Sequence, residues 1–108
     1  MILARVTGSV VATQKLQSMT GRKLLVIEPM RVDEKTQAEL RSTGRTLVAV
    51  DALGAGEGEM VLVVQGSSAR LTPETQEVPV DAVVIGIVDQ VGVRGKAIYS
   101  ARETAGRR

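Results

Sequence analysis

Three glycines at alternate positions, Gly54, Gly56 and Gly58, separate two apolar segments of this 108-residue chain. A phosphate-binding loop has superficially similar glycines, but its glycines must open a helix whose N-terminal amides face the anion. Here the segment that follows, 60–65, is rich in valine and therefore favours a strand. The pattern predicts a tight strand-to-strand connection, in which the glycines, Gly56 included, permit positive φ or a close backbone approach.

The apolar composition favours a β-sheet and argues for oligomerisation. Seventeen residues are valine, Phe and Trp are absent, and Tyr99 is the only aromatic residue. Small β-branched side chains suit a pleated sheet. A domain of this size buries a low fraction of its surface, and association with further copies is a common remedy.

The residue types that are missing exclude several functional classes. The chain has no Cys and no His, which removes thiolate metal sites, the commonest metal ligand and the usual general base. We therefore expect no catalytic residue, no cofactor and no metal. The N-terminus lacks the features of a signal peptide, and no apolar run approaches the ~20 residues of a membrane span. A cytoplasmic protein without a membrane partner is expected.

Charge is segregated along the chain, although the net charge is only +2. Residues 1–50 and 94–108 are each basic, with a net charge of +4, whereas residues 51–93 have a net charge of −6. Solvated faces explain such a distribution without any function. The alternative is complementary contact between copies in a head-to-tail ring.

Apolar patterns predict five main strands and a short final one. These segments are 2–13, 23–30, 46–52, 60–65, 80–93 and, at the end, 96–100. Gly8 is expected at a bend or bulge. Pro29 has no N–H to donate, so its strand should end there or lie at a sheet edge. The strand 80–93 is almost continuously apolar, which predicts that both faces are covered, the second by another subunit.

The polar segments predict connections. Residues 31–45 are expected to form an exposed loop or, equally, to contain a short helical turn at 34–40. Residues 66–71 resemble a serine cap followed by one helical turn, and 72–79 should be a loop. Five strands and one helical turn favour an all-β fold, a small closed or nearly closed five-stranded OB-like β-barrel, with a sandwich as the alternative. We expect one domain over 1–100 and a C-terminal tail over 101–108.

Five groups of residues, in order and with sensible spacing, resemble the EutN/CcmL family of bacterial microcompartment vertex proteins. They are Gly8-x-Val10-Val11-Ala12-Thr13-x-Lys15, Gly21-x-Lys23-Leu24-Leu25, Asp51-x-x-Gly54-Ala55-Gly56-x-Gly58-Glu59, Val61 to Arg70, and Pro79 to Asp89. The resemblance covers roughly residues 1–93. It implies an OB-like barrel that assembles as a cyclic homopentamer and caps the five-fold vertices of a protein shell in the cytoplasm. Hexameric shell proteins of another fold would form the facets, and the function would be structural, without catalysis.

The resemblance and the residue types together select candidates for the subunit interface. The candidates are Asp51, Gly54, Gly56, Gly58, Glu59, Ser67, Ser68, Arg70 and Asp81. Each has a simpler alternative role. The glycines are either an ordinary hairpin loop or part of the interface around the five-fold axis. Asp51 and Glu59 either accept hydrogen bonds from loop amides or are solvated, and Glu57 should be exposed.

The remaining candidates lie in or beside the segment 66–71. Ser67 and Ser68 fit a helix cap. Arg70 is the only cation of the acidic segment, and it could pair within the subunit with Asp51, Glu59 or Asp81, or across to a neighbour.

Two other functions fit the composition less well. An OB-fold nucleic-acid-binding module needs aromatic side chains on which bases stack, and this chain has one. A small enzyme could use paired carboxylates, but Asp81 and Asp89 would lie ~27 Å apart along one extended strand. A shell component is therefore the leading hypothesis.

Overall fold

The computed structural model describes residues 1–13, 17, 22–66, 69 and 81–101, and every described strand belongs to one of two sheets. The strands are β1 (Ile2–Val10), β2 (Lys23–Val32), β3 (Leu40–Ser42), β4 (Leu47–Asp51), β5 (Met60–Gln65), β6 (Ala82–Ile87), β7 (Gln90–Val93) and β8 (Lys96–Ser100). The expected strands at 2–13, 23–30, 46–52, 60–65 and 96–100 are thus confirmed, within a few residues at their ends.

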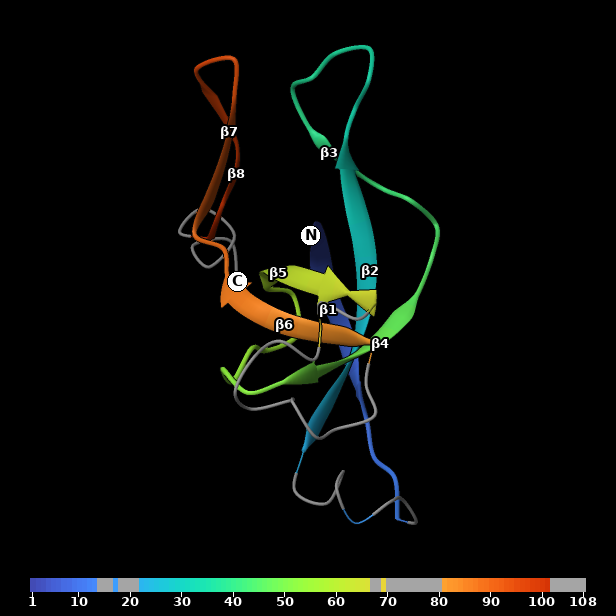
Figure 1. Cartoon of the computed structure of the whole chain (residues 1–108). Coiled ribbons are helices and arrows are strands. Elements are labelled where there is room, and N and C mark those ends of the chain that lie inside the picture. Colours follow the sequence, from blue (N-terminus) through green and yellow to red (C-terminus); the bar gives the residue numbers. More distant parts are fainter. Residues whose placement is uncertain (14–16, 18–21, 67–68, 70–80, 102–108) are drawn as a thin grey trace.

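Five strands close into a barrel in the order β1-β5-β6-β4-β2, because β2 also pairs with β1 (Figure 1). Closure through this pairing confirms the expected five-stranded barrel over a sandwich. Neighbours in the barrel are antiparallel except β4 and β6, which are parallel. The short strand β3 adds to the outer part of β2, and β7 and β8 form a separate two-stranded sheet.

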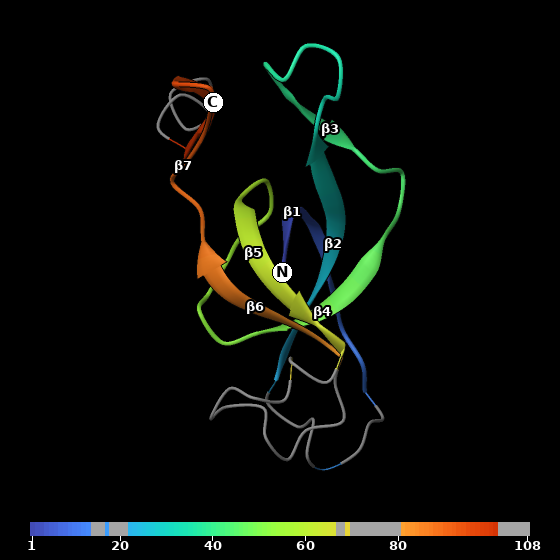
Figure 2. The same cartoon turned by 45° about the horizontal axis from the view of Figure 1, so that its top comes forward.

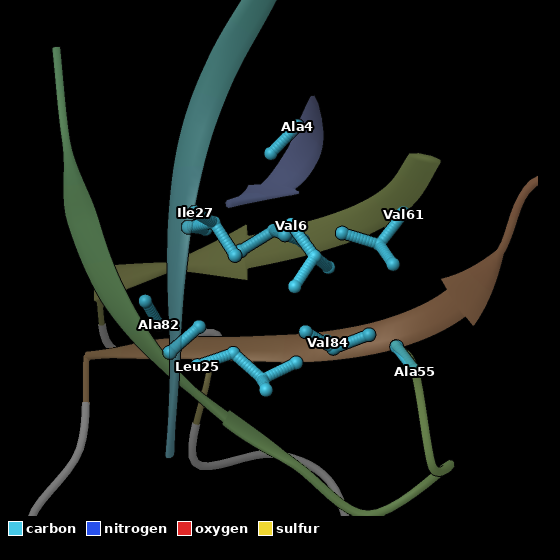
Figure 3. Close-up of a cluster of buried hydrophobic side chains, with 10 residues drawn as sticks. Ala4, Val6, Leu25, Ile27, Ala55, Val61, Ala82 and Val84 are labelled. Atoms are coloured by element: carbon cyan, nitrogen blue, oxygen red, sulfur yellow. The ribbon is translucent and has the colours of Figure 1, made fainter. Parts of the chain in front are cut away.

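The core fills the inside of the barrel with small side chains (Figure 3). Alternate residues of each strand point inward, as the two-residue period of a strand requires. The buried cluster comprises Ala4, Val6, Leu25, Ile27, Ala49, Ala55, Val61, Val63, Ala82 and Val84. Barrel diameter grows with the number of strands, so five strands enclose a narrow interior. Alanine and valine, together with Leu25 and Ile27, therefore fill it without a buried aromatic ring.

The β1–β2 register shifts between Val6 and Gly8, so the expected bulge at Gly8 is confirmed. Of the two outcomes expected at Pro29, the second is observed. β2 does not end there but continues to Val32, and Pro29 lies at a local edge where neither β3 nor β4 pairs with it. Pro29 O accepts hydrogen bonds from the Thr43 amide and hydroxyl. The backbone nitrogen and carbonyl of a strand residue face the same neighbouring strand. For Pro29 this is the side where β2 pairs with β4 as far as Ile27 and with β3 from Met30 onward. Pro29 lies between these two pairings, so no backbone N–H is required from it.

Two further expectations were wrong, one about a connection and one about a strand. Residues 31–45 are not a single loop, because β2 extends into them and β3 returns along it to form a hairpin. Residues 80–93 are not one strand: the chain leaves the barrel after Ile87 and begins a new hairpin at Gln90. An apolar run does not reveal which sheet a strand joins, and here Val88 N–H still bonds to Met60 O at 2.8 Å as the chain departs.

β6 carries apolar side chains that this chain leaves partly uncovered. Ile85 and Ile87 are each 37% exposed, whereas Val83 is buried in a small second cluster with Val50 and Ala69. Cover of this strand by another subunit stays a prediction. The expected helical turn at 66–71 and the loop at 72–79 lie mainly outside the described residues.

Candidate functional site

The glycine segment connects β4 to β5 across residues 52–59, and β5 follows it directly. The predicted strand-to-strand connection is confirmed, although eight residues make it longer than a tight hairpin. Gly54 and Gly58 have φ of 85° and 87°, the left-handed region that favours glycine. Gly56 does not have positive φ, so the expectation of positive φ was wrong for Gly56. A Cβ there would lie 3.4 Å from Glu59 Oε1, a close but tolerable approach.

Asp51 organises the first half of this loop from a buried position. The residue is 5% exposed. Its carboxylate accepts hydrogen bonds from the backbone amides of Leu53 at 2.8 Å, Gly54 at 3.2 Å and Ala55 at 2.7 Å. Charge-assisted bonds of this kind are stronger than those between neutral groups. Asp51 therefore accepts loop amides, which was one of its two expected roles. The expected pairing with Arg70 lies outside the described residues.

Glu59 organises the second half in the same manner. Its Oε1 accepts the Gly56 amide at 2.6 Å, and its own amide donates to Gly56 O at 3.1 Å. The Gly58 amide donates to Val6 O at 2.8 Å, which attaches the loop to β1. The loop amides are thus turned inward onto protein acceptors. They cannot cradle a phosphate, in agreement with the sequence prediction.

Two basic side chains that sequence reasoning did not select donate hydrogen bonds to carbonyl oxygens of the loop. Lys23 Nζ, at the start of β2, donates to Ala55 O at 2.8 Å and lies 3.9 Å from Asp51 Oδ2. Arg5 Nη1, in β1, donates to Gly58 O at 3.1 Å. Lys23 belongs to one of the groups that resemble the family, but no local pattern links Lys23 or Arg5 to this loop, because each is far from it in sequence. The loop is a preorganised surface element rather than a flexible connection.

A cleft of about 260 Å³ opens beside the loop, between the bulge of β1 and the start of β2. Its floor includes the core residues Val6 and Leu25, and Ser9, Lys23 and Glu57 contribute polar groups. Lys23 is already engaged by the loop. Among the described residues, no group of Asp and Glu side chains is placed to hold a metal ion. The cleft shows no arrangement for nucleophilic or acid–base catalysis.

The remaining interface candidates are Ser67, Ser68, Arg70 and Asp81, and the structure describes no cluster of them with this loop. Asp81 is exposed, and its carbonyl accepts the Gly66 amide at 2.7 Å. Ser67, Ser68 and Arg70 lie outside the described residues. Glu57 is exposed, as expected. Leu53, which sequence reasoning did not select, is 50% exposed at the outer side of the loop. None of the described helices could cross a membrane.

Comparison with known proteins supports this architecture over nearly the whole chain. The model of the EutN_CcmL family, "Ethanolamine utilisation protein EutN/carboxysome", matches residues 1–89. The bacterial microcompartment shell vertex protein EutN of Salmonella typhimurium is 43% identical over 99 residues, which cover 92% of this chain and 94% of that protein.

Two solved structures have the same fold. The structure of CcmL from Gloeobacter violaceus superimposes with a TM-score of 0.82 at 41% identity, covering 94% of this chain and 99% of that one. GrpN of Rhodospirillum rubrum, a pentameric microcompartment shell protein, has a TM-score of 0.70 at 43% identity and covers 86% of this chain and 98% of that one. The barrel and its glycine loop, whose amides bond to acceptors within the subunit, agree with these similarities. The similarities establish that the chain belongs to the EutN/CcmL family of microcompartment shell vertex proteins.

Proposed function

We propose that this chain forms a homopentamer that occupies the vertices of a bacterial microcompartment shell. The observation that carries the proposal is the likeness to the pentameric shell protein GrpN, which extends over 86% of the chain at 43% identity. The role is structural. A flat array of six-fold units cannot close into a shell, so hexameric shell proteins forming the facets are the partners, and five-fold rings close the corners.

The glycine loop fits a subunit contact. Hydrogen bonds from the loop amides to the carboxylates of Asp51 and Glu59 hold it in one conformation, so little conformational entropy is lost on association. Leu53 stands exposed on its outer side, and Ile85 and Ile87 are exposed on β6. In a cyclic ring each subunit offers two different surfaces to its neighbours. We assign the loop, with Gly54, Gly56 and Gly58, to one of them. We propose that Asp51, Glu59, Ser67, Ser68, Arg70 and Asp81 also contribute to the contacts between subunits.

The proposal includes the absence of catalysis and of nucleic-acid binding. The chain has neither His nor Cys. Its only aromatic residue, Tyr99, is 9% exposed beneath the Arg5 guanidinium and offers no platform for stacking bases. The acidic segment 51–93 would repel a phosphate backbone. The shell itself would lie in the cytoplasm.

Native mass spectrometry of the full chain tests the ring. We expect a complex of five 11.4-kDa chains at micromolar concentration. A stable monomer or dimer would contradict the proposal. Electron microscopy of the native cell without this protein tests the vertex role. Facets should still assemble, but shells should be unsealed or elongated; normally closed shells, with no second vertex gene present, would contradict it.

A further inference from the structure

Two hairpins project from the same end of the barrel, β7–β8 on one flank and β2–β3 on the other (Figures 1 and 2). They are separate elements, because β7 and β8 pair only with each other while β3 pairs with β2. A two-stranded hairpin on its own is marginally stable in water. A projecting pair of this kind therefore gains most from a surface outside its own subunit.

The tip of β7–β8 is basic, and its turn has a backbone conformation that is strained for a residue other than glycine. Val93 pairs with Lys96, which leaves Arg94 and Gly95 as a two-residue turn. Both have positive φ, 52° and 78°, the pattern of a type I′ turn that favours Asn-Gly. An arginine at the first position is strained, and such strain motivates a search for function. Arg94 and Lys96 are exposed and make no ion pair within the described part of the chain.

The tip of β2–β3 offers an acidic side chain on a rigid turn. Asp33 accepts the amides of Lys35 and Thr36, each at 2.9 Å, and also binds Arg41. These bonds fix the turn and engage both oxygens of the Asp33 carboxylate. Glu34 is different: its side chain is 84% exposed, and its only described ion pair is a 3.5 Å contact with the exposed Arg31. Exposed pairs of this length contribute little, so Glu34 is available to a stronger cation.

A ring brings these two tips together if its axis runs along the direction in which the hairpins project. The two hairpins project from the same end of the barrel on different flanks (Figures 1 and 2). In a ring with that axis, the β7–β8 flank of one subunit would therefore face the β2–β3 flank of the next. We propose that the tip of β7–β8 docks on the β2–β3 tip of a neighbouring copy, with Arg94 facing Glu34. This inference rests on the proposed ring. Arginine suits the contact because its fork binds a carboxylate through two parallel hydrogen bonds.

Charge reversal in the full-length protein tests the pairing. Arg94→Glu and Glu34→Arg should each weaken every contact, by up to about fivefold per interface. The variant with both changes should restore the ring. Arg45→Glu makes the same charge change away from both tips and should have no such effect. The measurement is the concentration at which pentamers dissociate, followed by native mass spectrometry at ~0.15 M salt, where exposed pairs are partly screened.

Arg94→Asn separates docking from local stability. Asparagine suits the first position of this turn, so amide exchange across 90–100 should slow while the ring dissociates at higher concentration. If Arg94 affected only the stability of its own hairpin, slower amide exchange across 90–100 would be accompanied by a ring that dissociates at lower concentration. The inference is overturned if neither charge reversal weakens the ring. It is also overturned if the ring of the double variant is as weak as the two single effects added together would make it. In those cases a pentameric wild type still supports the proposed function, whereas a monomeric wild type contradicts both.

Discussion

The guanidinium of Arg5 lies 5.9 Å from the centroid of the Tyr99 ring, and it also donates a hydrogen bond to Gly58 O at 3.1 Å. Arg5 is in β1, Tyr99 in β8 and Gly58 in the β4–β5 loop. One side chain thus contacts the barrel, the glycine loop and the projecting hairpin. Because a cation over an aromatic face is attracted to it, Arg5 couples the position of the hairpin base to the loop.

Arg5→Met should loosen two regions at once. Methionine keeps an apolar stem of similar length but loses the charge and the donor, which costs about 1–2 kcal/mol for the ring contact and the hydrogen bond together. Hydrogen exchange should accelerate both at 52–59 and at 90–100. Arg31→Met removes an exposed arginine of β2 and serves as the control. Faster exchange in only one of the two regions would show that Arg5 does not couple them.

Asp51→Ala should destabilise the protein strongly. The change leaves three loop amides without their acceptor, at a total cost of about 3 kcal/mol. Asp51→Asn keeps one acceptor oxygen and should lie between the alanine variant and the wild type. Glu57→Ala, in the same loop but exposed, should change the free energy of unfolding by about 0.5 kcal/mol or less. Urea unfolding at one fixed protein concentration gives the comparison, since association shifts apparent stability.

Valine should be less tolerated at Gly58 than at Gly56. Gly58 has φ of 87°, where a β-branched residue is strained by about 1–3 kcal/mol whatever the space around it. Gly56 lacks positive φ, and a new Cβ meets only the carboxylate end of Glu59 at 3.4 Å. The strain at Gly58 recurs in every subunit of a ring. Melting temperature and native mass of the two variants decide; equal tolerance would mean that φ does not limit this loop.

The strand positions could be predicted because they depend on local composition. The run 60–65 is rich in valine, which favours a strand, and in the fold Val61 and Val63 enter the core. The break after Ile87 could not be predicted, because apolar residues continue through it and only tertiary pairing shows that β7 leaves the barrel. The hairpin partner β3 was missed for the opposite reason: its three residues include too little apolar pattern to register as a strand.

The loop was predictable in part. Its carboxylates, Asp51 and Glu59, lie within a few residues of the amides that they accept, so sequence proximity made them candidates. Lys23 and Arg5 are 32 and 53 residues from the carbonyls that they bind. Their roles depend on strand register, which one sequence does not encode locally. The expectation for Gly56 failed because an alternating glycine pattern does not tell which residue takes the left-handed conformation.

The turn at Asp33 should respond to acid. Hydrogen bonding to the Thr36 amide and then to Arg41 lowers the pKa of Asp33 from 3.8 to about 2. A carboxyl whose pKa falls on folding stabilises the folded turn above its unfolded pKa, and this contribution is lost as the pH falls through the folded value. The β2–β3 tip should therefore keep its structure at pH 5 and loosen between about pH 4 and pH 2. Arg41→Gln removes one cause and should raise the midpoint, although the amides of Thr36 and Lys35 still hold it below the ordinary value. Carbon-13 NMR of the Asp33 carboxyl measures both midpoints. An unshifted midpoint near 3.8 in the wild type would mean that the carboxylate does not organise this turn.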